Sequence, residues 1–159
     1  MKTRTLEHFN IRTERLTETL QFYTEVLGLR DGPRPGNPPR ETGAWLYSAD
    51  DVPVVHVSAF DRNDAKRVQW MNEYLGYRDI DSLHGSGAVD HMAFLAEEYD
   101  EMVAHCKSLD IPFRERLVAA LGLRQIFVTD PNGISIELNY RGSVDGAGAV
   151  VPSTDKEQP

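Results

Sequence analysis

The chain repeats one order of elements twice, and this repeat restricts the possible fold more than any other feature of the sequence. The segment LEHFNI at 6–11 matches VDHMAF at 89–94, which lies 83 residues further along. The helical patterns at 20–29 and 103–112 keep the same offset. Each half reads as a strand, a helix and three further strands. The sequence therefore predicts a duplicated β-α-β-β-β module and an α+β fold.

The first half shows this order in its hydrophobic spacing. Residues 5–12 alternate as a strand does, and apolar side chains then recur at helical spacing until Gly28, a residue type that commonly ends helices. The helical positions are Leu16, Leu20, Tyr23 and Leu27. Residues 30–40 contain four prolines and two glycines, which favour a loop or an irregular edge strand. Two strand-like runs, 43–49 and 52–60, complete the half.

The second half follows the same order. Residues 88–95 read as a strand, and a helical pattern extends from Tyr99 to Leu109. Three strand-like runs follow, at 112–118, 122–129 and 133–140. The sequence DPNG at 130–133 separates the last two runs and is a strong signal for a hairpin turn.

These patterns divide the chain into four segments. The first module covers 5–60, and a connector at 61–87 contains an expected amphipathic helix. The second module covers 88–140, so that residues 1–140 are expected to form one domain. The tail at 141–159 lacks aromatic residues, and we expect it to be disordered.

Composition excludes several classes of function. The chain has 17 Lys and Arg against 25 Asp and Glu, a net charge of −8, and no basic cluster longer than two residues. This pattern argues against binding to nucleic acid or to an anionic membrane. A single cysteine, Cys106, excludes an internal disulfide and a cysteine-based zinc site, and it suits the cytoplasm. No signal peptide or membrane-spanning run is expected.

Four ionisable residues occupy matching places in the two modules. His8 and His91 lie on the expected first strands, whereas His56 and Glu137 lie on the expected last strands. Strand alternation sets each of them opposite the large apolar residues of its strand. If the apolar faces pack on the helices, all four side chains lie on the concave side.

Two neutral imidazoles and one carboxylate make up the facial triad of non-haem iron(II) oxygenases. His8, His91 and Glu137 are the candidates for this triad, and His56 extends it to a possible four-ligand site. A glutamate at an inward strand position is hard to explain otherwise, because burial of an unpaired carboxylate is costly. Other residues receive simpler interpretations: His84 and His105 as structural or solvated, Cys106 as core, and Trp45, Tyr47, Arg124 and Phe127 as possible lining of the concave side.

Several motifs resemble the vicinal oxygen chelate superfamily. They are LEHFNIRTERLTETLQFYTEVLGLR, VDHMAFLAEEYDEMVAHCKSLDIPF and FVTDPNGISIELNY, which together lie within residues 5–140. The resemblance implies paired βαβββ modules whose mixed sheets curl around a metal site. It also implies one of several activities, because the superfamily includes extradiol dioxygenases, glyoxalase I, an epimerase, fosfomycin-resistance transferases and metal-free bleomycin-binding proteins.

The resemblance maps the metal ligands onto His8, His91 and Glu137. Glyoxalase I-like members carry a carboxylate or amide where this chain has His56, whereas extradiol dioxygenases carry an acid/base histidine there. Dioxygenases also usually have a tyrosine where this chain has Phe127, so this position departs from their pattern. Because His56 fits the dioxygenase pattern and not the glyoxalase pattern, we expect an extradiol-type dioxygenase. It would hold Fe(II), with Mn(II) as a substitute, and use His56 in proton transfer.

Two other functions remain open at this point. One is a glyoxalase I-like lyase or isomerase that uses Zn, Ni or Co as a Lewis acid, with His56 as a fourth ligand. The other is a metal-free protein that sequesters a small molecule. We expect a small-molecule substrate with adjacent oxygens, and a homodimer because Val52–Val57 is interpreted as an apolar edge.

Overall fold

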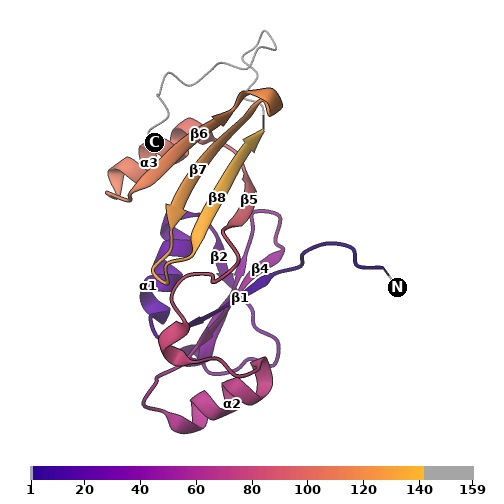
Figure 1. Cartoon of the computed structure of the whole chain (residues 1–159), viewed down its shortest axis with the longest axis vertical. Coiled ribbons are helices and arrows are strands. Elements are labelled where there is room, and N and C mark those ends of the chain that lie inside the picture. Colours follow the sequence, from indigo (N-terminus) through magenta and orange to yellow (C-terminus); the bar gives the residue numbers. More distant parts are fainter. Residues whose placement is uncertain (1, 142–159) are drawn as a thin grey trace. The chain divides into compact units, whose positions relative to one another are not determined.

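A computed structural model describes residues 2–141 of the chain (Figure 1). The chain divides into two compact units, a first unit that ends at His84 and a second unit that begins at Gly85. The expected disorder of 141–159 falls outside the described residues, except that Arg141 is the last residue of a strand.

The first unit contains one mixed four-stranded sheet in the order β1-β4-β3-β2. Its strands are β1 (Phe9–Thr13), β2 (Arg30–Gly32), β3 (Gly43–Tyr47) and β4 (Pro53–Ala59). Strand β1 runs parallel to β4, and the other neighbours are antiparallel. Its helical segments are α1 (Leu16–Gln21), η1 (Phe22–Val26), η2 (Arg40–Thr42), α2 (Ala65–Leu75) and η3 (Ile80–Ser82).

The second unit repeats this sheet in the order β5-β8-β7-β6. Its elements are β5 (Met92–Ala96), α3 (Tyr99–Ser108), β6 (Phe113–Val118), η4 (Ala119–Leu121), β7 (Leu123–Thr129) and β8 (Ser135–Arg141). Here β5 runs parallel to β8, as β1 does to β4. The α+β fold and the repeated β-α-β-β-β order are thus confirmed.

The first strands of both units begin later than the alternation pattern predicts. The parallel ladders start at Phe9, opposite Val55, and at Met92, opposite Ile136. His8 and His91 therefore lie just before the ladders rather than within the strands. Alternation alone cannot locate this boundary, because a strand ends where its partner stops supplying hydrogen bonds.

The first helix also differs from the single helix expected up to Gly28. Segment α1 continues into the π-helical turn η1, in which Leu27 N–H donates to the carbonyl of Phe22 at 3.2 Å. Gly28 then adopts a φ of 70°, the left-handed conformation that commonly ends helices.

One face of each sheet forms the core. In the first unit Leu46, Val55 and Val57 have no exposed surface, and in the second unit Ile126 and Ile136 have none. We call this the core face. The opposite side, which carries Asn10, Trp45 and His56 in the first unit and Phe127 and Glu137 in the second, is called the ligand face.

The interpretation of Val52–Val57 as an apolar edge is wrong. Strand β4 lies between β1 and β3, so its apolar run is that of an inner strand. The expected homodimer therefore loses the support of this segment.

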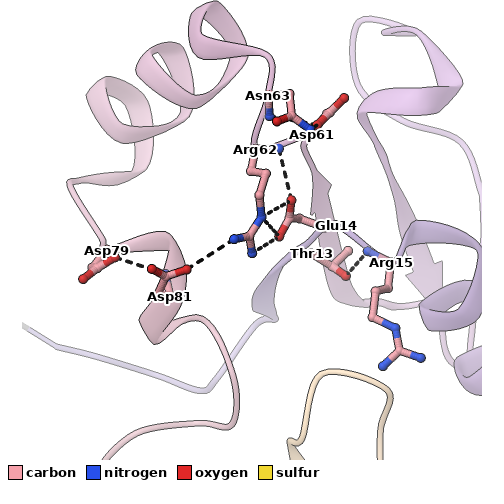
Figure 2. A network of polar contacts seen from close by, with 8 residues as sticks. All are labelled: Thr13, Glu14, Arg15, Asp61, Arg62, Asn63, Asp79 and Asp81. Carbon is pink, nitrogen blue, oxygen red and sulfur yellow. Dashed lines mark hydrogen bonds and ion pairs between the residues drawn. The ribbon is translucent and has the colours of Figure 1, made fainter.

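The connector contains the predicted helix, α2. Its N-cap is Asp64, whose carboxylate accepts a hydrogen bond from Arg67 N–H. Figure 2 shows how Arg62, which precedes this helix, binds two acids. Its Nη2 lies 2.6 Å from Glu14 Oε2, and its Nη1 lies 3.2 Å from Asp81 Oδ1. This network joins the residue after β1 to η3 and to the segment that precedes α2.

Within residues 2–141, no helix combines the length and the apolar character that crossing a membrane requires.

Candidate metal centre

The second unit brings His91 and Glu137 together on its ligand face. His91 Nε2 lies 3.2 Å from Glu137 Oε2, and His91 Nδ1 lies 2.8 Å from Asp90 Oδ2. Because an ionised carboxylate only accepts hydrogen bonds, Asp90 favours the proton of neutral His91 on Nδ1. The lone pair of His91 then lies on Nε2 and faces the carboxylate of Glu137.

Two amide side chains fix the orientation of Glu137. Asn139 Nδ2 donates a hydrogen bond of 2.6 Å to Glu137 Oε1, so only Oε2 faces His91. Gln125 Nε2 donates in turn to Asn139 Oδ1 at 3.0 Å. Glu137 is 7% exposed and Gln125 is equally buried. This relay holds the carboxylate in one position with one oxygen available.

The donor set fits a divalent cation. A lone pair on nitrogen and a carboxylate oxygen 3.2 Å apart repel each other unless a proton or metal ion lies near both. First-row metals bind imidazole and carboxylate at about 2.0–2.2 Å, which separates adjacent ligands by about 3 Å. The hydrogen bond that the far ring nitrogen, Nδ1, donates to Asp90 is the support that metal-bound histidines usually have.

His56 of the first unit has different surroundings. Its ring stacks on Trp45, with 4.6 Å between the ring centroids and an angle of 2° between the planes. Asn10 Nδ2 lies 2.5 Å from His56 Nδ1 and also donates to Ser58 Oγ at 3.1 Å. With Nδ1 as the acceptor, neutral His56 carries its proton on Nε2.

Burial, with smaller contributions from His8 and Arg34, lowers the pKa of His56 from 6.5 to about 4. Both the loss of water around the ring and the nearby positive charges oppose the imidazolium form. His56 is therefore neutral at physiological pH.

His8 also contacts Trp45, edge to face, with 4.6 Å between the ring centroids. The His8 and His56 rings lie 6.3 Å apart, so the two imidazoles do not meet as His91 and Glu137 do. His8 Nδ1 lies 3.4 Å from Glu7 Oε2, yet it is buried and makes no hydrogen bond to the described residues. One ring nitrogen of His8 thus lacks a hydrogen-bond partner within residues 2–141.

Within the second unit His91 contacts Glu137, and within the first unit the His8 and His56 rings lie 6.3 Å apart. No group of three or more His, Cys, Asp or Glu side chains suited to a metal ion is gathered in the described part of the chain.

Sequence reasoning missed the polar residues that orient these groups. Asn10, Asp90, Gln125 and Asn139 are not among the residues that the sequence predicted for the site. The usable signal is spacing, because a polar residue two positions from a candidate ligand on a strand shares its face.

The possible lining residues divide between the two faces. Trp45 and Phe127 lie on the ligand face, where Phe127 contacts His91 edge-on with 6.0 Å between the ring centroids. Arg124 lies on the core face, with its guanidinium over the ring of Tyr99 of α3. The lining role is therefore wrong for Arg124. Cys106 is fully buried, which confirms its place in the core.

Comparisons with known proteins agree with this fold. The profile described as "Glyoxalase/Bleomycin resistance protein/Dioxygenase superfamily" matches residues 5–138. A lactoylglutathione lyase of Pseudomonas putida is 25% identical over 146 residues, and the match covers 82% of each chain.

Two solved structures share the fold at lower identity. A genomically encoded fosfomycin resistance protein of Listeria monocytogenes is 16% identical with a TM-score of 0.58, over 89% of this chain and 97% of that one. A lactoylglutathione lyase of Agrobacterium tumefaciens is 18% identical with a TM-score of 0.54, over 87% and 95%. The extent of the profile match shows that this chain belongs to the Glyoxalase/Bleomycin resistance protein/Dioxygenase superfamily.

Proposed function

We propose that this protein is a metal-dependent enzyme that acts on a small substrate with two adjacent oxygens, in a reaction of the extradiol dioxygenase type. The observation that supports a bound metal ion is the short distance between His91 Nε2 and Glu137 Oε2. His8 is the third ligand in this proposal, which completes two imidazoles and one carboxylate.

Iron(II) suits this donor set, and Mn, Zn, Ni or Co compete for the same ligands. When bound, such an ion supplies Lewis acidity, and iron adds the capacity to activate oxygen. The protein's own contribution is orientation. Asp90 and Asn139 hold His91 and Glu137 so that one nitrogen and one oxygen are presented together.

In this proposal His56 handles a proton rather than binding the metal. Its Nδ1 is engaged by Asn10 and its ring face by Trp45, which leaves the Nε2–H edge to donate to a substrate oxygen. The neutral ring takes up a proton at Nδ1 only if the Asn10 amide reorients. Proton transfer by such a group typically contributes about 10²–10⁴ in rate.

A lyase or isomerase of the glyoxalase I type is the second candidate. The similarity to the lactoylglutathione lyase of Pseudomonas putida favours it. In that reaction class Zn, Ni or Co serves as the Lewis acid and His56 becomes a fourth ligand. The contact of His56 with Asn10 supports the dioxygenase instead. With Nδ1 accepting a hydrogen bond from Asn10, the neutral ring carries its proton on Nε2, so neither nitrogen offers a free lone pair to a metal.

The test compares both reactions with the same preparation. Protein reconstituted with Fe(II) without oxygen is then supplied with O2 and a panel of catechols, and protein loaded with Zn, Ni or Co is given a hemithioacetal. Oxygen uptake with a catechol supports the dioxygenase. Turnover of the hemithioacetal alone overturns it in favour of the lyase. Failure to take up any divalent ion supports a metal-free sequestering protein instead.

The variant His56→Phe, whose side chain neither coordinates a metal nor transfers a proton, separates the two roles of this side chain. For the dioxygenase, the variant keeps its metal affinity and loses about 10²–10⁴ in rate. For the lyase, loss of a fourth ligand weakens metal binding itself. The measurement is isothermal titration with Zn²⁺ beside the rate assay.

We further propose that the protein is a cytoplasmic homodimer. A single, fully buried cysteine suits a reducing compartment. Light scattering during size-exclusion chromatography tests the dimer, and a monomeric mass at micromolar concentration contradicts it.

A further inference from the structure

Two arginines of the first unit meet at Thr42, the last residue of η2. Arg34 Nη2 donates to Thr42 Oγ1 at 3.1 Å, and Arg67 Nη2 donates to the Thr42 carbonyl at 3.1 Å. Their other hydrogen bonds also go to neutral acceptors, the carbonyls of Pro39 and Ala59, and the Arg67 guanidinium lies 4.4 Å from the centroid of the Trp70 ring. Both guanidinium groups are thus held in place by uncharged groups.

Neither arginine forms an ion pair with a carboxylate among residues 2–141. Other arginines of the same unit do. They are Arg30 with Asp51, Arg40 with Asp31 and Arg62 with Glu14. In a chain with 25 acidic residues, two partly buried guanidinium groups without an ion-paired carboxylate are unusual.

Arg34 is the less satisfied of the two. Its Nε is buried and makes no hydrogen bond within the described residues. Burial and the charges of Arg40 and Arg67 lower its pKa, and Asp31 only partly opposes them. A partly buried cation with an unused donor binds an incoming anion more strongly than an exposed one, because water screens it less.

Arg34 also lies beside the candidate proton carrier. Gly32, Trp45 and His56 form one cross-strand row on the ligand face, and Arg34 follows Gly32 by two residues. The charge of Arg34 contributes to the lowered pKa of His56, which indicates that the two groups are near each other.

We propose that Arg34 and Arg67 bind an oxyanionic group of the substrate, a carboxylate or a phosphate, at Thr42. This rests on the proposed function only in calling the ligand a substrate. The substrate class becomes a small acid whose adjacent oxygens lie at one end and whose anionic group lies at the other.

The experiment measures binding to the full-length, metal-free protein by isothermal titration. The probes are 3,4-dihydroxybenzoate, its neutral analogue 4-methylcatechol, and inorganic phosphate. We expect the acid to bind at least about tenfold more tightly than the neutral analogue, as for hydrogen bonds to a charged group. Phosphate that competes with the acid indicates a site for oxyanions in general, whereas phosphate without effect assigns a carboxylate site.

The variants are Arg34→Gln and Arg67→Gln, with Arg62→Gln as the matched control, because Arg62 already has its own acids (Figure 2). Each of the first two should lose at least about tenfold in affinity for the acid and nothing for the neutral analogue. Arg34→Lys, which keeps the charge, should recover part of the loss. Circular dichroism confirms that the variants remain folded.

Equal binding of acid and neutral analogue by the wild-type protein overturns the proposal, as does wild-type affinity in folded Arg34→Gln. The metal plays no part in these titrations. If the protein binds 3,4-dihydroxybenzoate more tightly than 4-methylcatechol but turns over no catechol, the proposed function is wrong and the anion site is still supported.

Discussion

The two units place an ionisable side chain at the same point of the same sheet and surround it differently. In the first unit, His56 on β4 lies opposite Trp45, which stacks flat on its ring. In the second, Glu137 on β8 lies opposite Phe127, and its carboxylate faces His91. One site keeps a neutral ring against an aromatic wall, and the other keeps a carboxylate beside an imidazole.

Each unit orients this side chain with an asparagine, but from a different strand. Asn10 reaches His56 from the neighbouring strand β1, whereas Asn139 reaches Glu137 from two residues further along β8 itself. Neither asparagine has a counterpart in the other unit. The position equivalent to Asn10 is Ala93, which pairs with Glu137. The position equivalent to Asn139 is Ser58, two residues after His56.

The residue that pairs with Asn139 or Ser58 explains why only the second unit has the relay from Gln125 through Asn139 to Glu137. Gln125 pairs with Asn139 and donates to it, whereas Gly43 pairs with Ser58. A Cβ at Gly43 would lie 1.9 Å from the carbonyl oxygen of Val57, so no side chain fits there. A duplicated fold thus supplies two equivalent positions, and local packing decides which chemistry each can support.

The largest effect should come from Glu137→Gln. The amide lacks the negative charge that attracts a cation, so the affinity for Zn²⁺ or Fe²⁺ should fall more than about 100-fold, beyond the loss typical of an outer-shell partner. Titration of the metal-free protein measures this loss. Glu14→Gln in the first unit is the control and should keep full affinity. Wild-type affinity in Glu137→Gln would remove this carboxylate from the ligand set.

Asn139→Ala should have an intermediate effect. It frees Glu137 Oε1 and the orientation of the carboxylate, which should lower metal affinity about 10–100-fold. Ser58→Ala, at the equivalent position of the first unit, should change it less than about threefold, because Ser58 contacts Asn10 rather than a ligand. Equal losses in the two variants would contradict the difference between the units.

The smallest effect concerns the titration of His56. In the metal-free protein, NMR should show its ring titrating near a pKa of about 4. Trp45→Ala should move this pKa upward, because removing the indole admits water, whereas Trp45→Phe should preserve the lowering. A wild-type ring that titrates near 6.5 would contradict the burial of His56 against Trp45.

The same shift predicts the sign of a pH effect on stability. The folded pKa lies below the unfolded value of 6.5, so protonation favours the unfolded state. The contribution of His56 to the free energy of unfolding is therefore complete above 6.5 and declines as pH falls toward about 4. Urea titrations across this range should show a shallower decline for His56→Gln than for the wild type.

Much of this organisation could be predicted, because it depends on local patterns. Alternation along β4 and β8 correctly set His56 and Glu137 opposite Val55 and Ile136, which are fully buried. The turn at Asp130 was predicted from its DPNG sequence. Its carboxylate accepts hydrogen bonds from the N–H groups of Asn132 and Ile134. The assumption that Val52–Val57 is an edge failed because strand order depends on contacts between distant segments.

By itself, the sequence determined the duplicated α+β modules and the sheet faces of His56 and Glu137, because periods of 2 and 3.6 residues record which face each side chain takes. Only the tertiary structure decided what each position meets. Trp45 on His56 and Asn139 on Glu137 depend on cross-strand register and side-chain direction. A periodic pattern carries no information about those contacts, because they join residues through space rather than along the chain.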